Sequence, residues 1–590
     1  MTLTGAATMH PRYPDNPPAS LLTLSSIAAG LVWWAMNLKP SLAGGQINWF
    51  SAFIYFMATL FCLQTAIRSL ENLAHFIDLF GSRKSTGQKG TAAYATVKEI
   101  KDALTKDKRG PFWGCVVDGS RLALFFDYAS NVMTVAPSGS GKGIYSVVPN
   151  IMSIRHSKIV ADFKGELSCL CKAALKARGE TVRVLNPGNL WSHIIGESDA
   201  CNPLDMIAED LKRPAGLRDV MDDLREMTAQ ILPEPDGKET DNSYFREGSR
   251  RLIGDAILFE VMVDLFEASL SSVALLIENR TRLEDTARWV AGVDIEGKPH
   301  ADGPLPIEHT EWAKVHDPQD VAEFAALVRA RAKNLIALMS GGDNRTFDSF
   351  ITGAQQALAP FAFGHLAAAM GRSTFNMADL KGNKPTTLFI VADASRMEAY
   401  KAYIGLMQWC CLTAMKRHEN KDRLVYGILD EVTNYRVNGL ENLLTWGRSY
   451  GLRLHLIFQD LAAFERTYGK TALDTLLSET EIKQFLPGQR SPKTLELISR
   501  QMLGEQSAIA MSANRSIEHL GLNETISEVG RPLATPEEIR RMDKGILFVR
   551  QHRPILFEPV SYAEIEPWRS QAGINPFHGK PFRKKVKLRL

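Results

Sequence analysis

The sequence predicts an α/β fold that is interrupted by an all-helical region and preceded by a hydrophobic hairpin. Three observations support this prediction. Short apolar runs alternate with helix-compatible segments, which is typical of a parallel sheet whose ligands lie at the carboxyl ends of its strands. Between residues 205 and 376 the apolar periodicity is purely helical, and two uncharged apolar runs lie near the N-terminus. At 590 residues the chain is also too long for a single core.

Composition excludes several classes of protein. The net charge of +3 is close to neutral, so any attraction to nucleic acid must come from local patches. Seven cysteines, an odd number without zinc-like spacing, do not form a disulfide framework. We interpret them as reduced core residues of a cytosolic body.

Residues 1–80 are expected to form a membrane anchor. The uncharged runs at about 20–37 and 47–67 approach the roughly 20 residues that span a bilayer. A polar leader before the first run, and the second run directly after it, argue against a cleaved signal peptide. Basic residues outside both runs place the two ends in the cytoplasm. The sequence therefore predicts a multi-pass inner-membrane protein with most of its chain cytoplasmic, and a linker at 81–90.

The first part of the α/β domain, residues 91–204, contains a phosphate-binding loop. An apolar run from Val132 to Val135 enters a loop of small residues that ends in Gly-Lys and is followed by a helix-compatible segment, Ile144 to Met152. In such a loop the backbone N–H groups and the helix N-terminus bind phosphate, and Lys142 reaches the terminal phosphates. The expected nucleotide-contacting residues are Ala136, Pro137, Ser138, Gly139, Ser140, Gly141, Lys142, Gly143 and Ile144.

Two positions of this loop depart from the general pattern. Ala136 stands where a glycine is expected, and Gly143 replaces the Ser or Thr whose hydroxyl normally binds Mg²⁺. The alternative to a phosphate-binding loop is a Gly-Ser turn with a solvated lysine. The acidic motif farther along the chain makes this alternative less favourable.

A second strand, Lys158 to Asp162, ends in polar residues. Asp162 and Lys164 lie where the carboxyl end of a parallel strand would place them beside a ligand, so both are candidate nucleotide contacts. Spacing equally favours a helix-start cap at this position.

Residues 205–376 are predicted to form an all-helical domain inserted into the α/β domain. Two apolar stripes recur at helical spacing and indicate a helical core rather than a ligand site. The first comprises Leu217, Val220, Met221, Leu224, Met227 and Ile231, and the second Val321, Phe324, Val328 and Leu335.

The α/β domain resumes over residues 377–562 and brings a pair of acids. The strand Leu424 to Leu429 ends in Asp430, placed to hold Mg²⁺, and Glu431, a base for an attacking water. Adjacent acids also occur at helix N-termini, where they complement the dipole. Because the chain also contains the Gly-Ser-Gly-Lys loop, the catalytic interpretation of the two acids is favoured.

One more strand, Arg453 to Phe458, has a polar residue on either side. Gln459 is a candidate to sense the terminal phosphate or orient water. Arg448 is a candidate to reach a neighbouring subunit's site, although a surface arginine or a structural ion pair explains it equally well.

The tail, residues 563–590, is basic. Such a tail binds phosphate backbones, anionic lipid or a partner, although a solvated, disordered end is the commoner outcome. No zinc-protease helix, Cys-x-x-Cys pair or nucleophile elbow competes with the nucleotide chemistry.

Taken together, these motifs resemble those of the type IV coupling proteins, the membrane-anchored ATPases of bacterial conjugation and type IV secretion. The resemblance runs in order along nearly the whole chain. After the two apolar runs it is carried by Gly90–Ala95, Ala136–Gly143, Asp162–Leu167, Asn202–Asp205, Leu429–Glu431, the spacing of Arg448, Gly451 and Gln459, and Arg531–Leu533. Gly143 is similar to many members of that family. Phe163 stands where proline is frequent, and the external loop is short.

The resemblance implies a RecA-like P-loop domain with an inserted helical domain, assembled as a hexamer around a channel. It implies ATP and Mg²⁺ as cofactors, and a role in passing a relaxase–single-stranded-DNA complex or protein effectors to the components of a secretion channel. DNA contacts would then be to the backbone and to stacked bases, without sequence specificity.

Two other functions remain open. A receptor would bind nucleotide only to assemble the hexamer and recruit secreted proteins, but it has no need of Glu431. A double-stranded DNA segregation pump shares the architecture, but it usually has a long linker and a C-terminal DNA-reading module, which we do not find.

Overall fold

A computed structural model describes most of the chain beyond the N-terminal region. The described residues are 89–105, 110–234, 243–265, 267–300, 303–341, 344–435, 437, 439–515 and 522–590, together with positions 53, 56, 57, 59, 60, 63 and 64. They form two compact units. The larger unit contains Lys89–Gln506 and Gly530–Leu590, and the other contains Met1–Gln88 and Ser507–Val529.

The larger unit is built on a nine-stranded sheet with the order β13-β12-β9-β3-β8-β7-β4-β6-β5. The seven strands from β9 to β5 in this order are parallel to one another. Strand β12 is antiparallel to both of its neighbours, β9 and β13. The bounds are β3 Asn131–Val135, β4 Ser157–Asp162, β5 Thr181–Leu185, β6 Thr386–Val391, β7 Val425–Leu429, β8 Leu452–Phe458, β9 Thr480–Phe485, β12 Gly545–Val549 and β13 Ile555–Phe557.

Both faces of this sheet are covered, which explains why its central strands are apolar throughout rather than alternating. Along β3, Met133 and Val135 enter one hydrophobic core, whereas Val132 and Ala136 enter the other. All residues of β3, β4, β6 and β7 are buried. The strands predicted from apolar runs are therefore confirmed, to within two residues at their ends.

One face is covered by the helices that follow β3, β4 and β5 and by a separate two-stranded hairpin. The helices are α4 Val148–Ser153, α5 Glu166–Ala177 and the short α6 Ser192–Ile195, and the hairpin is β1 Phe112–Asp118 with β2 Ser120–Phe125. Helix α3, Val97–Ala103, precedes the hairpin and begins with a capping box at Thr96.

The opposite face is covered by helices from the second half of the chain. They are α15 Met397–Arg417, α16 Leu440–Trp446, α17 Leu461–Tyr468, α18 Lys470–Glu479, α19 Pro492–Glu496 and α20 Pro536–Arg541. The shorter turns of the unit are the π-helical η1 Gly143–Val147 and η8 Leu497–Met502, and the 3₁₀ turns η2 Gly216–Arg218, η3 Ile307–His309, η4 Trp312–Val315, η5 Met377–Lys381, η6 Ala394–Arg396, η7 Gly447–Tyr450 and η9 Tyr562–Glu564.

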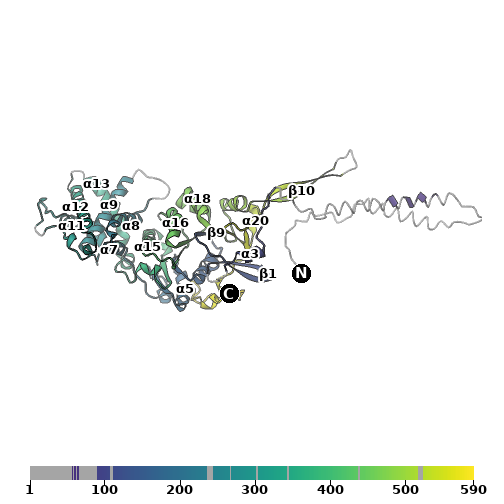
Figure 1. Ribbon diagram of the computed structural model, residues 1–590, viewed down its shortest axis with the longest axis horizontal. Helices are drawn as coiled ribbons and strands as arrows, with labels where there is room; N and C mark the ends of the chain where they lie inside the picture. The colour runs from purple at the N-terminus through teal and green to yellow at the C-terminus, as the bar shows by residue number, and fades with distance from the viewer. Residues whose placement is uncertain are drawn as a thin grey trace, which may run out of the picture. The chain divides into compact units, whose positions relative to one another are not determined.

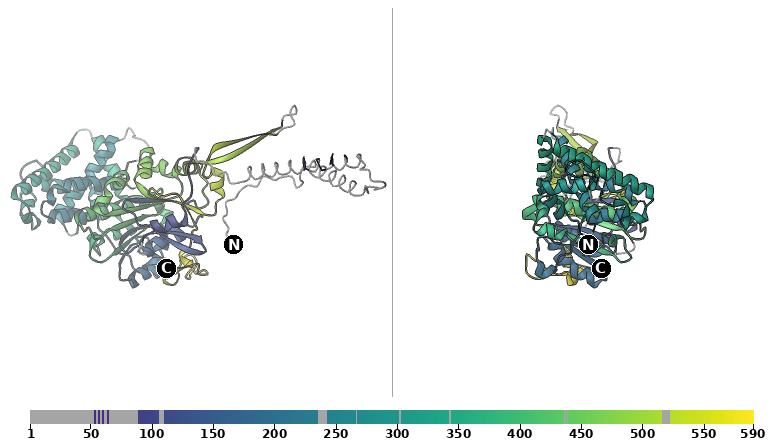
Figure 2. Two further views of the ribbon diagram at one scale, coloured as in Figure 1. Left: turned by 45° about the vertical axis from the view of Figure 1, so that its right-hand side comes forward. Right: turned by 90° about the vertical axis from the view of Figure 1, so that its left-hand side faces the viewer.

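Between β5 and β6 the chain is helical, as predicted. The helices are α7 Leu204–Lys212, α8 Val220–Ile231, α9 Ser243–Val263, α10 Leu270–Glu278, α11 Arg280–Ala291, α12 Pro318–Ser340, α13 Asn344–Ala362 and α14 His365–Ala369. Figures 1 and 2 show them gathered at the end of the unit away from β1. The two apolar stripes lie in the core of this region, on α8 with the preceding turn and on α12.

The two segments that join the helical region to the sheet are hydrogen-bonded to each other. The Thr374 N–H donates to the Ala200 carbonyl at 3.0 Å, and the Ala200 N–H donates to the Thr374 hydroxyl at 3.0 Å. Arg417 at the end of α15 adds an ion pair, since it donates to Asp210 of α7 at 2.5 Å and to Asp223 of α8. Burial raises the pKa of Asp210 to about 7, against the opposing effect of Arg417.

The C-terminal segment is ordered and packs on the sheet domain. It contains β14 Ile565–Glu566, α21 Trp568–Gln571 and β15 Leu588–Arg589, and β14 pairs in parallel with β15. Trp568 and Leu588 are buried in the core that also contains α4 and α5. The expectation that a solvated, disordered end is the commoner outcome is therefore wrong here, because apolar residues between the basic ones anchor the segment.

In the other unit, the structure describes most of a hairpin, β10 Glu505–Arg515 with β11 Leu522–Pro532, which leaves the larger unit and returns to it. Across it the Ser507 hydroxyl donates to Glu528 at 2.8 Å. Apart from scattered positions of the second, the two predicted membrane spans lie outside the described residues. Within the described part of the chain, no helix combines the length and apolarity that a bilayer crossing requires.

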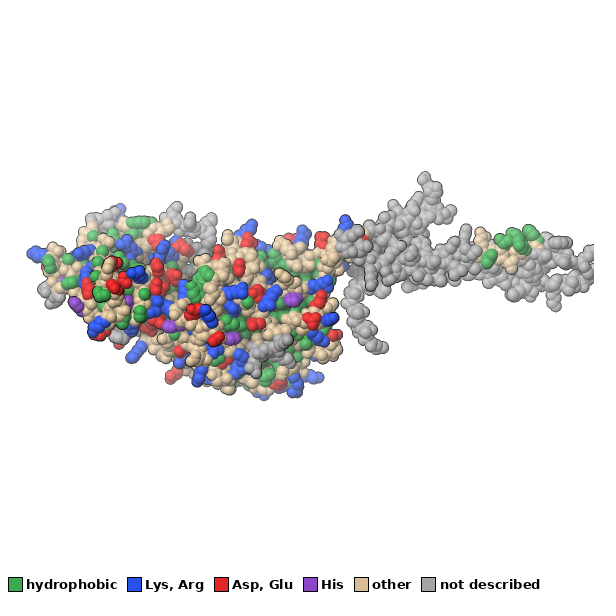
Figure 3. Space-filling model, viewed as in Figure 1, with side chains coloured by type: hydrophobic (Ala, Val, Ile, Leu, Met, Phe, Trp, Pro, Cys, Tyr) green, Lys and Arg blue, Asp and Glu red, His purple; other side chains and the backbone are tan. Residues whose placement is uncertain are grey.

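Charged side chains of both signs are interspersed over the face of the molecule drawn in Figure 3. This distribution agrees with the nearly neutral net charge of +3.

Candidate functional site

The loop after β3 has the backbone of a phosphate-binding loop. It is anchored to the neighbouring strand, because the Ala136 N–H donates to the Phe458 carbonyl at 2.9 Å. Gly139 and Gly141 have φ values of +80° and +78°, a region that other residues rarely adopt. At Gly141 a Cβ would lie 2.5 Å from the Tyr145 ring, whereas at Gly139 it would meet nothing within 4 Å.

The helix predicted for Ile144 to Met152 begins as one turn of π-helix, η1, and continues as α4. Single π turns inside α-helices are frequent at functional sites. Pro149 does not end the helix; it lies at the start of α4, directly after the π-helical turn.

Lys142 meets both acids of the second motif. Its ammonium lies 3.1 Å from Asp430 Oδ1 and 2.7 Å from Glu431 Oε1, and the three side chains are 15 to 20% exposed. The motifs lie almost 290 residues apart in sequence and meet because β3 and β7 both flank β8. The arrangement joins a cation for phosphate to carboxylates for a metal ion and a water.

The backbone at the acidic motif holds Glu431 in an uncommon conformation. Its φ is +52°, which for a residue other than glycine costs about 1 kcal/mol or more. The Glu431 N–H donates to Asp430 Oδ1 at 2.9 Å, and the Asn434 amide donates to Glu431 Oε2 at 2.8 Å. Strain of this kind persists at functional sites where the surroundings fix the side chain.

Burial raises the pKa of Asp430 although the adjacent Lys142 ammonium favours its ionised form. A further cation beside this carboxylate would favour its ionised form. Its position is thus consistent with the role of metal ligand predicted for it.

Asp162 and Lys164 follow β4, the neighbour of β7. Asp162 is buried and accepts hydrogen bonds from the Ser168 N–H at 2.8 Å and from the Ser168 hydroxyl at 2.9 Å. It therefore caps α5, which was the alternative interpretation, while burial raises its pKa. Lys164 is exposed. Nucleotide contact by either residue stays a prediction.

Gln459 and Arg448 lie at opposite ends of β8. Gln459 is half-buried and directly follows Phe458, which pairs with Val135 beside the phosphate loop. Arg448 is exposed in η7, before the seven residues of β8, and thus about 20 Å from the loop edge. The structure does not bring Arg448 to the site of its own chain. Its exposed position is compatible with a surface arginine and with the predicted role in a neighbouring subunit, which stays a prediction.

A buried polar network below the loop was missed by sequence reasoning. The Thr134 hydroxyl lies 2.7 Å from His455 Nε2 and donates to Gln484 Oε1 at 2.9 Å. The Ser146 hydroxyl of η1 donates to the same Gln484 oxygen at 3.0 Å. Burial lowers the pKa of His455 to about 3. Three strands are thereby tied to the helix that begins at the phosphate loop. Isolated polar residues in apolar strands were the only sequence signal.

The residues present fit a nucleotide with its metal ion. The Ser140 hydroxyl is buried in the loop without a hydrogen-bond partner, and the space beside Gly141 is too narrow for any side chain. Among the described residues no cluster of three or more His, Cys, Asp or Glu side chains forms a metal cage. Asp430 alone would supply the carboxylate, which agrees with the sparse protein ligation that Mg²⁺ needs beside phosphates.

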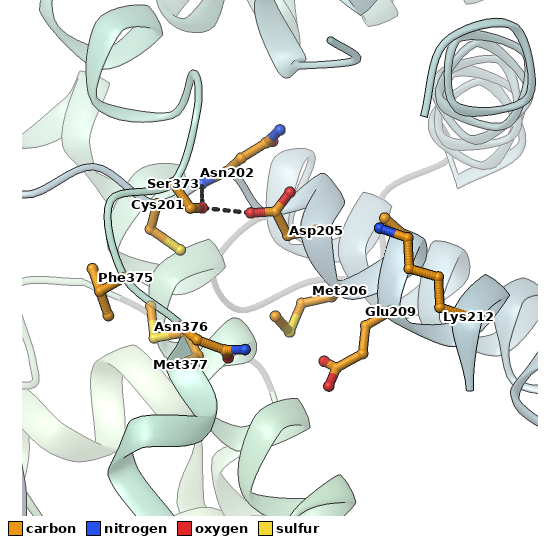
Figure 4. Close-up of a pocket in the computed structure, with 11 residues that line it drawn as sticks. Cys201, Asn202, Asp205, Met206, Glu209, Lys212, Ser373, Phe375, Asn376 and Met377 are labelled. Carbon is orange, nitrogen blue, oxygen red and sulfur yellow. Dashed lines mark hydrogen bonds between the residues drawn. The ribbon is translucent and has the colours of Figure 1, made fainter. Parts of the chain in front are cut away.

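A cavity of about 280 Å³ lies at the junction with the helical region. Figure 4 shows Asp205 and Glu209 projecting from α7 and Ser373 on the facing segment, where Ser373 bridges Asn202 and Asp205. The Ser373 hydroxyl accepts from the Asn202 N–H at 2.8 Å. This site holds the junction together and contains none of the predicted catalytic residues.

Comparison with known proteins gives one family. The sequence profile described as "Type IV secretory system Conjugative DNA transfer" matches residues 83–578. The chain is 28% identical over 451 residues to a conjugal transfer protein TraG of Escherichia coli, an alignment that covers 72% of this chain and 64% of that protein. It is 23% identical over 574 residues to the protein VirD4 of Rhizobium rhizogenes, covering 92% and 77%.

Solved structures give the same fold. The bacterial conjugative coupling protein TrwBdeltaN70 superposes with a TM-score of 0.52 at 16% identity, covering 81% of this chain and 97% of that one. The plasmid coupling protein TrwB in complex with ADP and Mg²⁺ superposes equally, over 80% and 97%. The RecA-like P-loop fold is thereby confirmed.

Proposed function

Because the chain belongs to the type IV secretory system conjugative DNA transfer family, we propose that it is a coupling ATPase that drives DNA or protein cargo toward a secretion channel. The observation that supports this most directly is the contact of Lys142 with both Asp430 and Glu431. A protein that only binds nucleotide needs the lysine, but it has no need of a strained, oriented glutamate.

Each residue of the site has a role in this proposal. Lys142 exchanges its carboxylate partners for the terminal phosphates of ATP, and the N–H groups of Gly139 to Gly143 hold the phosphate chain. Mg²⁺, held by Asp430 and phosphate oxygens, would neutralise the charge that develops on the transferred group. Glu431, oriented by Asn434, polarises the attacking water. Gln459 lies on the neighbouring strand to sense hydrolysis.

The assembly belongs to the same proposal. In a homo-hexamer, Arg448, which is exposed at the end of β8 opposite the phosphate loop, would reach a neighbouring subunit and stabilise transition-state charge there. The partners are a relaxase bound to single-stranded DNA, secreted effectors and the components of the secretion channel. The predicted spans would anchor the chain in the inner membrane.

The test is ATP hydrolysis by the purified full-length chain, with and without single-stranded DNA. Lys142→Ala and Glu431→Gln should each abolish turnover, and Glu431→Gln should retain nucleotide binding because the phosphate loop is intact. Lys470→Ala and Glu296→Gln, at exposed positions away from the site, serve as matched controls. Turnover that survives Glu431→Gln would refute the assignment of the base.

The second candidate is the receptor that uses nucleotide only for assembly. Gly143 favours it, because a hydroxyl normally binds Mg²⁺ at that position. Nucleotide binding and hexamer formation without any turnover, with DNA present, would establish this function instead.

A further inference from the structure

The C-terminal segment carries the positive charge of the whole chain. Residues 563–590 contain seven basic and two acidic side chains, a net charge of +5, whereas the entire chain has a net charge of +3. All other residues together are therefore slightly acidic. The two acids are already neutralised, because Glu564 lies 3.0 Å from Lys587 and Glu566 lies 3.1 Å from Arg569.

The backbone that carries the basic side chains is fixed by hydrogen bonds. The N–H groups of Lys584, Lys587 and Leu590 donate to the carbonyls of Ala563, Glu564 and Glu566 at 2.8 to 3.0 Å. Lys580, Arg583, Lys584, Lys585 and Arg589 are exposed, and within the described part of the chain none of them has an ion-pair partner. A fixed row of unpaired cations indicates a polyanionic partner.

Aromatic rings lie among these cations. Phe577 is 55% exposed, and its ring meets that of Trp191 edge to face at 5.7 Å. His578 stacks on Phe582 at 5.6 Å, and the Lys584 ammonium lies over the Phe582 ring at 5.3 Å. These two groups of contacts adjoin at the chain neighbours Phe577 and His578, and we call Trp191, Phe577, His578, Phe582 and Lys584 together the aromatic–basic surface.

This surface is attached to the end of the sheet that carries the nucleotide site. The Asn575 amide donates to Glu166 Oε1 at 2.8 Å, at the start of α5. The Trp191 indole donates to the Lys164 carbonyl at 2.8 Å, and its ring covers Gly165. Figures 1 and 2 show the C-terminal segment lying beside α5.

We propose that the aromatic–basic surface binds single-stranded DNA, with phosphates on the basic row and bases stacked on Phe577 and its neighbouring rings. This inference rests on the proposed function and adds to it a specific DNA-binding surface on the C-terminal segment. Rigid exposed rings beside cations are the combination that binds single strands without sequence preference. Duplex DNA keeps its bases stacked on each other and offers only phosphates, so the surface prefers single strands. An anionic membrane would use the cations but not the stacked rings.

The test measures binding of a fluorescent oligothymidylate, roughly 30 nucleotides long, to the full-length chain in neutral-lipid nanodiscs. Phe577→Ala should weaken binding about 5- to 100-fold and leave the salt dependence unchanged. The combined Arg583→Gln, Lys584→Gln and Lys585→Gln variant should lower the slope of log affinity against log salt by about 2, since each lost single-strand phosphate contact removes about 0.7.

Controls separate the surface from general effects. Phe363→Ala removes a more exposed ring, 94% exposed, in the helical region and should leave binding unchanged. Lys98→Gln, Lys470→Gln and Lys544→Gln remove three exposed lysines elsewhere and should leave the slope unchanged. Melting curves confirm that each variant is folded.

The outcomes are distinct. If both surface variants bind oligothymidylate with the affinity and salt dependence of the wild type, this inference is overturned and the proposed function is left intact. No oligothymidylate binding by the wild type would overturn DNA as cargo as well. Loss of binding to phosphatidylserine-containing vesicles in the basic variant, with oligothymidylate binding unchanged, would assign the surface to the membrane instead.

Discussion

Two glycines of the phosphate loop offer a test of the site that needs no knowledge of the cargo. Gly139 and Gly141 have nearly the same positive φ, so alanine meets the same backbone strain at both. They differ in surroundings. A Cβ at Gly141 would meet the Tyr145 ring at 2.5 and 2.7 Å, whereas a Cβ at Gly139 would meet nothing within 4 Å. The comparison isolates the packing of the loop.

The expected sizes follow from these contacts. Left-handed backbone costs about 1 kcal/mol for alanine, so Gly139→Ala should raise the Kd for ATP about fivefold. Gly141→Ala adds the displacement of a ring, about 1 to 3 kcal/mol, and should raise the Kd about 30-fold or more. The assay is titration with a fluorescent ATP analogue.

A double variant completes this test. In a Tyr145→Ala background, Gly141→Ala should cost only the backbone strain and raise the Kd about fivefold relative to Tyr145→Ala alone. Equal effects of the two glycine variants, or no recovery when Tyr145 is shortened, would refute the proposed loop geometry.

Three further predictions concern stability and catalysis. Because the pKa of His455 is lowered in the folded state, the free energy of unfolding falls as the pH drops below 6.5, by about 2 kcal/mol at pH 5. His455→Gln should therefore reduce the difference in Tm between roughly pH 7 and pH 5. An unchanged difference would contradict this prediction. Arg417→Ala leaves the carboxylates of Asp210 and Asp223 without their cation and should lower the Tm by at least about 6 °C. Arg213 is a more exposed partner of Asp210, so Arg213→Ala should lower the Tm by about 2 °C or less. Asn434→Ala removes the hydrogen-bond donor that orients Glu431 and should lower kcat for ATP hydrolysis about tenfold with little change in KM. Steady-state kinetics measure both constants, and a rise in KM alone would assign Asn434 to nucleotide binding.

The sequence was most informative where a strand ends in polar residues. Apolar runs located the central strands, and the loops that follow two of them supplied the candidates Lys142, Asp430 and Glu431, which the structure brings into contact. The helical insertion was equally accessible, because its apolar stripes recur at a single period.

The remaining features depend on contacts that no local pattern encodes. The partners of His455 come from other strands, so only the register of β3, β8 and β9 brings Thr134 and Gln484 to it. Arg448 and Gln459 were correctly placed on either side of one strand, but local sequence does not show which site an exposed arginine at the far end of that strand reaches. The hairpin β10–β11 was not predicted at all.

The bonded pair Ala200 and Thr374 has a consequence for how such chains diversify. It brings together the two segments that flank the helices of the insertion, between β5 and β6. The insertion is therefore attached as a cassette, and exchanging it leaves the order of the strands and the phosphate loop untouched. A lineage can therefore replace the helical region in a single recombination event and inherit the sheet domain unchanged.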